Sequence, residues 1–231
     1  MFLYFFLNMA SVSIPFIYSF ERRMRFIKWW KQVFLSIAIV ASVFIVWDII
    51  FTKNGVWGFN EKYLIGLDIF GLPIEEWLFF ICIPYACIFT HYAFIYFFPG
   101  LRLSRKVSNS ISVLIVITLL LILVFNYDKA YTFYNYVLVI TLLVYSLVTK
   151  EKSIQVFYIT FLIILLPFFL VNGVLTGSFI EEQVVWYNDQ ENLGIRIGTI
   201  PIEDMGYAFS LLYLNLILIE KFTRGQIKVN R

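Results

Sequence analysis

The sequence predicts an all-α polytopic membrane protein, and three observations indicate this class. Of the 231 residues, 61% are hydrophobic and only 14% are charged, whereas a soluble domain carries roughly 25% charged residues. The mean hydropathy is +0.84. The apolar residues gather in runs whose length approaches the about 20 residues that a membrane-crossing helix needs.

Seven apolar runs are candidates for transmembrane helices. They occupy residues 1–20, 33–52, 73–97, 110–126, 132–149, 153–171 and 200–219. The first run has no basic region before it and no small-residue cleavage site after it. We therefore expect it to be a retained helix rather than a signal peptide.

The basic residues indicate an orientation for these seven helices. All Lys and Arg residues except Lys53, Lys62, Lys129 and Arg196 fall on one side of the predicted membrane, and they include the tail residues Lys221, Arg224, Lys228 and Arg231. Cytoplasmic loops carry an excess of basic residues. The pattern therefore predicts a protein of the cell membrane with its N-terminus outside and its C-terminus in the cytoplasm.

One acidic motif occurs twice. Leu72-Pro73-Ile74-Glu75-Glu76 begins the third run, and Ile200-Pro201-Ile202-Glu203-Asp204 begins the seventh, 128 positions later. The same offset matches Asn60 with Asn188 and Gly66 with Gly194. We interpret this as an internal repeat of three helices.

The repeat defines a domain organisation. Residues 1–100 form the first three-helix repeat, residues 132–231 form the second, and residues 101–131 supply a linker helix. Three crossings end on the far side of a membrane, so one extra helix returns the second repeat to the orientation of the first. The two repeats are then parallel, related by a pseudo-two-fold axis along the membrane normal, and their acidic motifs meet at the same depth.

The paired acids have a structural and a functional interpretation. Pro73 and Pro201 suit the first turn of a helix, where acidic side chains are favoured by the helix dipole and by free N–H groups. The acids can therefore be simple caps. However, each motif carries two acids where one is enough, and adjacent helix positions point about 100° apart. One acid of each pair can cap its helix while its neighbour faces the centre of the bundle.

Acidic residues at membrane depth are functional candidates by default. A desolvated carboxyl group next to a second one favours its protonated form, so a single site can hold a protonated acid beside an ionised base. We therefore expect proton donation to, and proton removal from, a very apolar substrate. The candidate catalytic residues are Glu75, Glu76, Glu203 and Asp204.

Further polar and aromatic residues are candidates for substrate contact. Asp48 and Asn172 end the second and sixth runs, and four aromatic residues flank the matched asparagines. The interfacial aromatic belt of membrane proteins explains the aromatic residues equally well. The candidate substrate-binding residues are Asp48, Trp57, Phe59, Asn60, Asn172, Trp186, Tyr187 and Asn188.

The remaining composition excludes several kinds of site. The chain has a single histidine, His91, and two cysteines, Cys82 and Cys87, inside one apolar run. These residues cannot build a disulfide framework or a zinc site, so we expect no metal. A net charge of +3 gives no indication of nucleic-acid binding.

The motifs together resemble the carotenoid lycopene cyclase domain family, the membrane-integral type that is made as two small subunits or as one fused chain. The resemblance covers essentially the whole chain and both repeats, which indicates the fused form. It rests on Trp57-Gly58-Phe59-Asn60, Leu72-Pro73-Ile74-Glu75-Glu76-Trp77 with Phe79-Phe80, Asn172-Gly173 with Leu175-Thr176-Gly177, and Ile200-Pro201-Ile202-Glu203-Asp204.

The resemblance implies that the linear ψ-ends of lycopene are cyclised to β-rings, giving γ- and β-carotene in carotenoid biosynthesis. A protein acid protonates the terminal double bond, the neighbouring alkene closes the ring, and a base removes a proton. Because this is a net isomerisation, we expect no cofactor, and no G-x-G-x-x-G follows a predicted strand. The implied partners are lycopene taken from the bilayer, the lipid membrane and enzymes of the carotenoid pathway.

Three other classes of protein remain as alternatives. A small proton-coupled transporter also suits parallel repeats with intramembrane carboxylates, although its acids would lie nearer the membrane centre. A prenyltransferase would need Asp-rich D-x-x-x-D motifs to hold Mg²⁺ and diphosphate, and none occurs in the sequence. The third alternative is a purely structural assembly protein.

Overall fold

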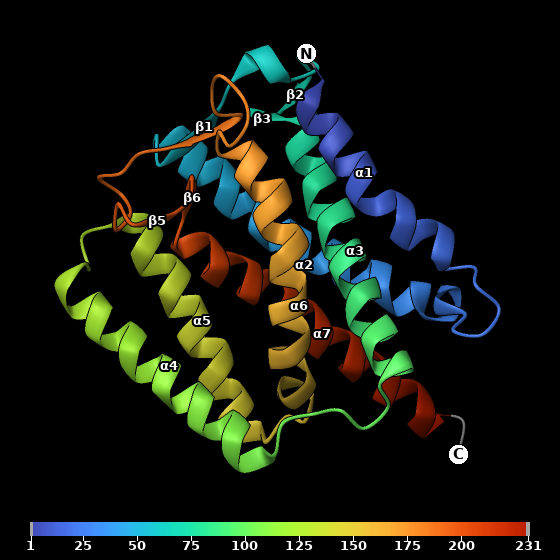
Figure 1. Ribbon diagram of the computed structural model, residues 1–231. Helices are drawn as coiled ribbons and strands as arrows, with labels where there is room; N and C mark the ends of the chain where they lie inside the picture. The colour runs from blue at the N-terminus through green and yellow to red at the C-terminus, as the bar shows by residue number, and fades with distance from the viewer. Residues whose placement is uncertain (1, 230–231) are drawn as a thin grey trace.

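The computed structural model describes residues 2–229, with side chains up to Thr223. Within this part of the chain, seven α-helices form a bundle, as the hydropathy predicts (Figure 1). The helices are α1 (Leu3–Tyr18), α2 (Trp30–Lys53), α3 (Ile74–Phe97), α4 (Arg105–Phe125), α5 (Ala130–Thr149), α6 (Ser153–Leu175) and α7 (Glu203–Val229).

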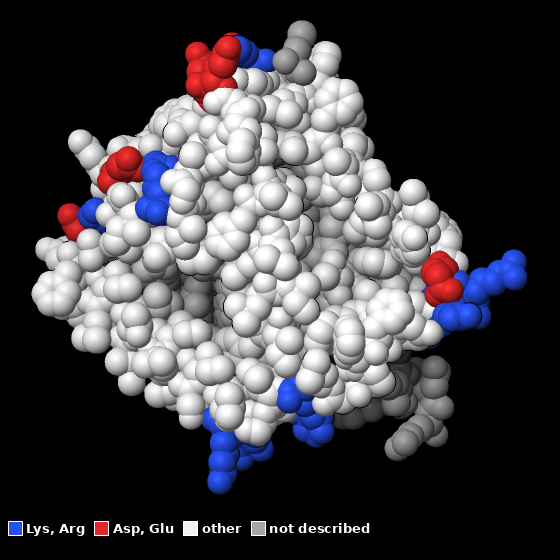
Figure 2. Space-filling model, viewed as in Figure 1, with Lys and Arg blue, Asp and Glu red and all other residues white. Residues whose placement is uncertain are grey.

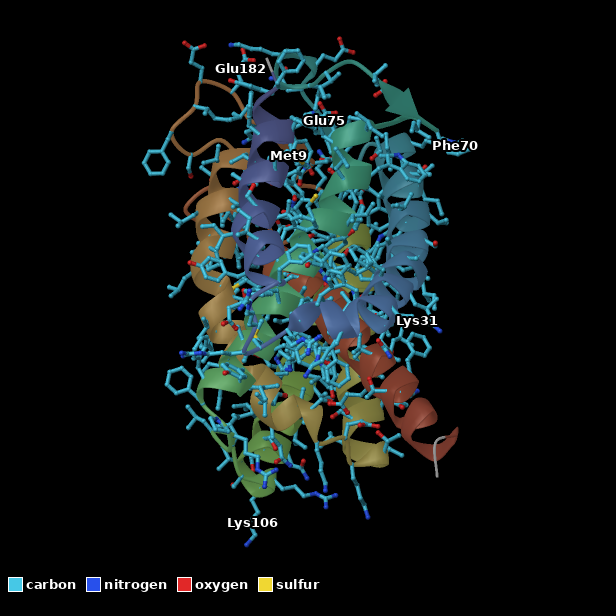
Figure 3. All side chains as sticks on the ribbon, turned by 90° about the vertical axis from the view of Figure 1, so that its right-hand side faces the viewer. Met9, Lys31, Phe70, Glu75, Lys106 and Glu182 are labelled. Atoms are coloured by element: carbon cyan, nitrogen blue, oxygen red, sulfur yellow. The ribbon has the colours of Figure 1, made fainter. Side chains whose placement is uncertain are left out.

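The helices form a membrane-embedded body. Six of them, α2 to α7, are long and apolar enough to cross a membrane, while α1 is apolar but has only 16 residues. Figure 2 shows a wide uncharged belt with Lys, Arg, Asp and Glu confined to its margins. Glu182 and Lys106 lie at opposite ends of the bundle (Figure 3). Of the basic residues that predicted the orientation, Arg224, Lys228 and Arg231 lie outside the described side chains.

The helix contacts follow one scheme in both halves of the chain. In the first half, α1 and α2 pack on α3; in the second half, α5 and α6 pack on α7. The halves join because α2 also packs on α7, and α6 also packs on α3. The helix between the halves, α4, lies outside this set and packs on α5 and α6.

The long loops before α3 and α7 contain short strands that gather near the ends where these two helices begin (Figure 1). Strand β1 (Trp57–Phe59) pairs antiparallel with β4 (Val185–Tyr187), which joins the two loops. Two hairpins then lead into the helices with equivalent registers. They are formed by β2 (Asp68–Ile69) with β3 (Leu72–Pro73), and by β5 (Arg196–Ile197) with β6 (Ile200–Pro201).

Three helix boundaries near the acidic motifs differ from the prediction. Pro73 and Pro201 stand in the hairpins just before α3 and α7, rather than within the first helical turn. Helix α6 continues past the predicted end at residue 171, because the Thr176 amide donates to the Asn172 carbonyl over 2.9 Å. Asn172 therefore lies inside the last turns of α6.

Away from the acidic motifs, the bundle is held by a buried aromatic and aliphatic core. Phe157 and Tyr213 stack in it with ring centroids 5.1 Å apart. Polar pairs also join helices there, since Ser36 Oγ donates to Asn215 Oδ1 over 2.7 Å, as is common between membrane helices. His91 belongs to this region, with its Nδ1 atom 2.7 Å from Thr160 Oγ1.

Candidate active site

The first acid of each pair holds the loop that leads into its own helix. Glu75 and Glu203 are fully buried. The Ile65 amide donates to Glu75 Oε1 over 2.6 Å, and the Leu193 amide donates to Glu203 Oε1 over 2.8 Å. Thr132 Oγ1 adds a 2.7 Å hydrogen bond to the same Glu203 oxygen. These two carboxyl groups therefore bind loop backbone, and neither of them lines the cavity described next.

The second acid of each pair faces a common cavity. Glu76 from α3 and Asp204 from α7 both line a cavity of about 440 Å³. Tyr4 donates its hydroxyl to Glu76 Oε2, and Tyr131 donates to Asp204 Oδ1 over 2.6 Å. Tyr4 and Tyr131 stand at corresponding places on α1 and α5. The two halves thus present one carboxyl group each, with one tyrosine each, to the same space.

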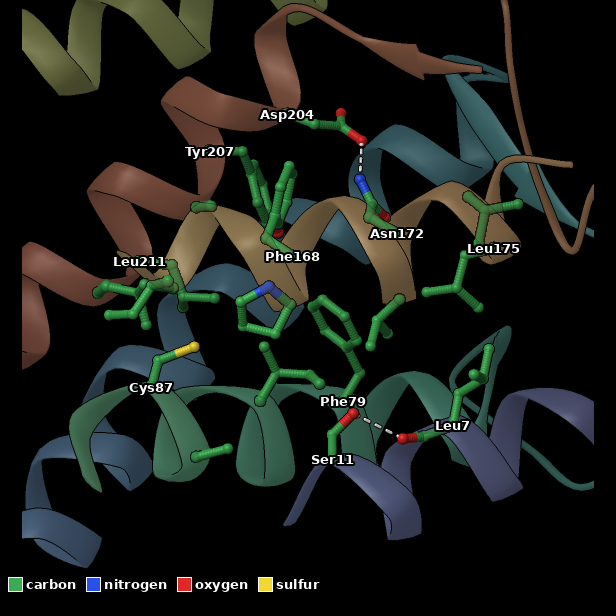
Figure 4. Close-up of a pocket in the computed structure, with 18 of the residues that line it drawn as sticks. Leu7, Ser11, Phe79, Cys87, Phe168, Asn172, Leu175, Asp204, Tyr207 and Leu211 are labelled. Atoms are coloured by element: carbon green, nitrogen blue, oxygen red, sulfur yellow. Dashed lines mark hydrogen bonds between the residues drawn. The ribbon is translucent and has the colours of Figure 1, made fainter. Parts of the chain in front are cut away.

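Asp204 receives more hydrogen bonds than Glu76 does. Besides Tyr131, Asn172 Nδ2 donates to Asp204 Oδ2 over 2.7 Å, as Figure 4 shows, and the Tyr187 hydroxyl donates to the same oxygen over 3.0 Å. Burial raises the pKa of the Tyr187 hydroxyl well above its ordinary value, and the Asp204 carboxylate raises this pKa further. Tyr187 therefore remains protonated and remains a donor. Three donors on one carboxylate favour its ionised form.

A third carboxyl group joins the cavity from α2. Asp48 is buried and lines the cavity. Its Oδ1 atom accepts hydrogen bonds from Trp57 Nε1 over 2.6 Å and from Thr52 Oγ1 over 3.2 Å. The Asp48 and Glu76 carboxyl groups also lie within hydrogen-bonding reach of each other. A hydrogen bond between two carboxyl groups requires a proton on one of them.

Two asparagines hold the helices that carry these groups. Asn8 Nδ2 donates to the Glu75 carbonyl over 2.9 Å, and Asn135 Nδ2 donates to the Glu203 carbonyl over 2.6 Å. They fix α1 against the start of α3, and α5 against the start of α7. The first turns of both acid-bearing helices are thereby positioned in the same way.

Sequence reasoning missed the tyrosines and asparagines of α1 and α5, although a signal exists. Tyr4 and Asn8 form a Tyr-x-x-x-Asn pattern that recurs as Tyr131 and Asn135, 127 positions later. The acidic motifs repeat at 128 positions, so an alignment at that single offset does not bring the Tyr-x-x-x-Asn patterns together. Tyr207, which also lines the cavity, had no such signal.

The predicted substrate-binding residues separate into two groups. Asp48, Trp57, Phe59, Asn172 and Tyr187 line the cavity. The others lie in the loops outside it and are Asn60, Trp186 and Asn188.

The loop residues hold loop structure. Asn60 Nδ2 donates to Glu182 Oε2 over 2.9 Å, and Asn188 Oδ1 accepts from the Gln190 amide over 3.1 Å. Trp186 lies across Gly58, where an added Cβ atom would stand 2.3 Å from the indole ring. Asn60 Oδ1 likewise accepts from the Lys62 amide over 3.0 Å, so the recurrence of Asn60 and Asn188 is accounted for by loops of similar structure.

The rest of the cavity is apolar and aromatic. Tyr207 stands in an aromatic cluster, with ring centroids 5.1 Å from Phe44 and 5.2 Å from Trp47. Phe79 and Phe168 line the wall near it (Figure 4). Among the described residues, no group of three or more His, Cys, Asp or Glu side chains is placed to hold a metal ion. The site thus combines three carboxyl groups with a largely hydrocarbon surface.

Comparison with known proteins assigns a family to this arrangement. The family model for lycopene cyclase matches residues 1–95 and 128–222. These two segments contain the acidic motifs and all the carboxyl groups of the cavity, and the unmatched stretch between them contains α4. No curated protein and no solved structure matches the chain. Since the family model covers most of the sequence, the chain belongs to the lycopene cyclase family.

Proposed function

We propose that the protein converts the linear ψ-ends of lycopene to β-rings, giving γ-carotene and then β-carotene. A carboxylic acid protonates the terminal double bond of the substrate and leaves a tertiary cation. The neighbouring alkene attacks this cation and closes the ring, and a carboxylate removes a proton to form the ring double bond. Atoms and electrons balance without an oxidant or a reductant, so the enzyme is an isomerase of the intramolecular lyase type.

Glu76 is the proton donor in this proposal. Its carboxyl group lies within hydrogen-bonding reach of Asp48, and only one of the two can be ionised if they share a hydrogen bond. Asp48 accepts from both Trp57 and Thr52, and hydrogen bonds to a carboxylate favour its charged form. Glu76 accepts from one such donor, Tyr4. With two donors on Asp48 and one on Glu76, the shared proton is carried by Glu76, which faces the cavity.

Asp204 is the base. It accepts hydrogen bonds from Tyr131, Asn172 and Tyr187, and these donors stabilise it as a carboxylate. The observation that carries the proposal is that Glu76 and Asp204 line one apolar cavity from opposite halves of the chain. A protonated acid and an ionised base in one water-poor site are what the two proton transfers require.

The aromatic wall has a role between the two proton transfers. The rings of Trp57, Phe79 and Tyr207 line the cavity around the carboxyl groups. Each cation–π contact stabilises a cation by about 0.5–2 kcal/mol. The same rings keep water away from the cation, which water would otherwise trap as an alcohol.

We further propose that the chain consists of two parallel three-helix repeats, which the sequence places at 1–100 and 132–231, and a linker at 101–131. Helix α5 begins at Ala130, so the second repeat includes the last two residues of that linker. The matched hairpins, the matched Asn8 and Asn135 contacts and the matched helix packing support this division. The distribution of basic residues supports a cell-membrane protein with its N-terminus outside and its C-terminus in the cytoplasm.

Pigment analysis of lycopene-accumulating cells tests the proposed reaction. Wild-type protein should convert lycopene to cyclic isomers of equal mass. Glu76→Gln should lower the conversion about 100-fold or more, because removing a general acid costs 10²–10⁴ in rate. Glu75→Gln is the matched control, since glutamine keeps an oxygen to accept from the Ile65 amide, and it should stay within a few-fold of wild type. Unchanged lycopene with membrane-inserted wild type would refute the proposed reaction.

A further inference from the structure

The cavity extends from the carboxyl groups as a groove along the helices. On α3 its lining runs from Glu76 to Thr90, which is about 21 Å at 1.5 Å per residue. On α6 it runs from Asn172 back to Phe161, which is about 16 Å by the same rise. Beyond the acidic end this lining is almost entirely apolar. The groove is therefore elongated along α3 and α6.

One end of the groove is closed and one side is open. The paired strands β1 and β4 cover the acidic end, where Trp57 and Tyr187 line the cavity. Along the side, Ala10 and Ile14 of α1 and Pro167 of α6 line the cavity and are also exposed at the surface of the bundle. Ile14 is 64% exposed. Figure 2 shows the surface hollowed within the uncharged belt, and we assign this opening to the gap between α1 and α6.

We infer that this groove binds the polyene chain of a linear carotenoid, which enters sideways from the lipid between α1 and α6 and lies along the helix axes. The inference rests on the proposed function and adds to it the orientation and route of the substrate. The occupant is an extended hydrocarbon because the groove is apolar along its length, opens to lipid and ends at carboxyl groups. One ψ-end of the substrate lies against Glu76 and Asp204.

The groove also restricts the order of events. An extended C40 polyene is longer than the groove, so its second end stays outside while the first end is at the carboxyl groups. The described part of the chain holds a single set of cavity carboxyl groups, and the acidic end of the groove is closed. The substrate must therefore leave and turn end over end before its second ring forms. The monocyclic product is released between the two cyclisations.

A bulky side chain far from the carboxyl groups tests the groove. Ala86 lines it ten residues beyond Glu76, which is about 15 Å. Ala86→Trp should lower cyclisation of lycopene at least 10-fold. It should spare a truncated linear apocarotenoid that has the same ψ-end and is too short to reach Ala86. Leu166→Trp, on the 69% exposed lipid face of α6, is the matched control and should convert both substrates.

A second variant repeats the test at a position where a bulky side chain should not cause misfolding. Ala10→Trp places the ring at the exposed rim on α1, where it meets lipid instead of packed protein, and it should discriminate between the two substrates in the same way. Full cyclisation of lycopene by both variants would overturn the inference. Loss of cyclisation of both lycopene and the truncated substrate, in both variants, would overturn it as well. Failure of wild type to convert either substrate would instead refute the proposed function.

Isotope dilution tests the release of the monocyclic product. Labelled γ-carotene is added to proteoliposomes while the protein converts unlabelled lycopene. The β-carotene formed afterwards should carry label in the proportion found in the γ-carotene pool. β-Carotene that forms without label, while γ-carotene alone is accepted as a substrate, would show that both rings form without release.

Discussion

At the scale of single residues, the two acids of each motif have different surroundings. Glu75 and Glu203 bind loop amides, while Glu76 and Asp204 face the cavity. Neighbouring positions on a helix point about 100° apart, so the same first turn can close a loop with one carboxyl group and offer the next to a substrate. Under the proposed function, the two acids of each motif serve these two tasks.

The donors around Asp204 give a prediction at this scale. Tyr131→Phe removes the 2.6 Å hydrogen bond to Asp204 Oδ1. A hydrogen bond to a charged group is worth about 1.5–3 kcal/mol, so cyclisation should fall by roughly one order of magnitude or more. Tyr134→Phe on the same helix, at an exposed position, should have no effect. Initial rates in proteoliposomes measure both variants, and equal rates would show that Tyr131 does not act on the base.

Sequence reasoning could locate the acids but could not say which of each pair faces the cavity. The Pro-Ile-Glu strings and their offset indicate the two helix starts without any structure. Which side chain faces the cavity depends on the rotation of α3 and α7 about their own axes, and packing against α1, α2, α5 and α6 sets that rotation. A one-dimensional pattern does not contain this information.

The pairing of Asp48 with Glu76 could not be predicted for a similar reason. The two residues belong to different helices, and the Trp57 indole that holds Asp48 comes from a loop strand. Asn60 and Asn188 show the converse case. Their match at the 128-residue offset is real in the sequence, but it reflects loops of similar structure rather than contact with the cavity.

At the scale of elements, the close approach of α5 to α7 positions Asp204, the proposed base. Gly206 faces α5, and an added Cβ atom there would stand 2.9 Å from Asn135 Oδ1. Asn135 in turn donates to the Glu203 carbonyl. Small residues at helix contacts let membrane helices approach closely. Gly206 is therefore part of what holds Asp204 in place.

Enlarging this glycine should disturb the contact. Gly206→Val should destabilise the protein by about 1–3 kcal/mol, the usual cost of overpacking, and should lower cyclisation as well. Ala38→Val on the exposed lipid face of α2 adds two of the same three carbon atoms and should be neutral. Thermal unfolding in detergent measures the difference, and equal melting temperatures would contradict the close α5–α7 contact.

At the scale of the whole molecule, each half of the chain holds an incomplete site. Asp48 and Glu76 come from the first half, and Asp204 comes from the second. The halves join through the pairs α2 with α7 and α6 with α3 and through the strand pair β1 with β4. The cavity exists only where these contacts form.

Splitting the chain should therefore preserve activity when both parts are present. A break after Gly100 falls in the connection between α3 and α4. Residues 1–100 and 101–231 expressed together should regain conversion of lycopene, and each part alone should have none. Activity of either part alone, measured by pigment chromatography, would contradict a site shared between the halves.

The most direct test of the shared site is a double-mutant comparison of cyclisation rates in proteoliposomes. Glu76→Gln and Asp204→Asn should each lower the rate by about 10²–10⁴. Residues that act as one unit show strongly non-additive losses. We therefore expect the double variant to be no slower than the slower single variant. A double loss equal to the product of the two single losses, or full activity in either single variant, would contradict one acid–base site built from both halves.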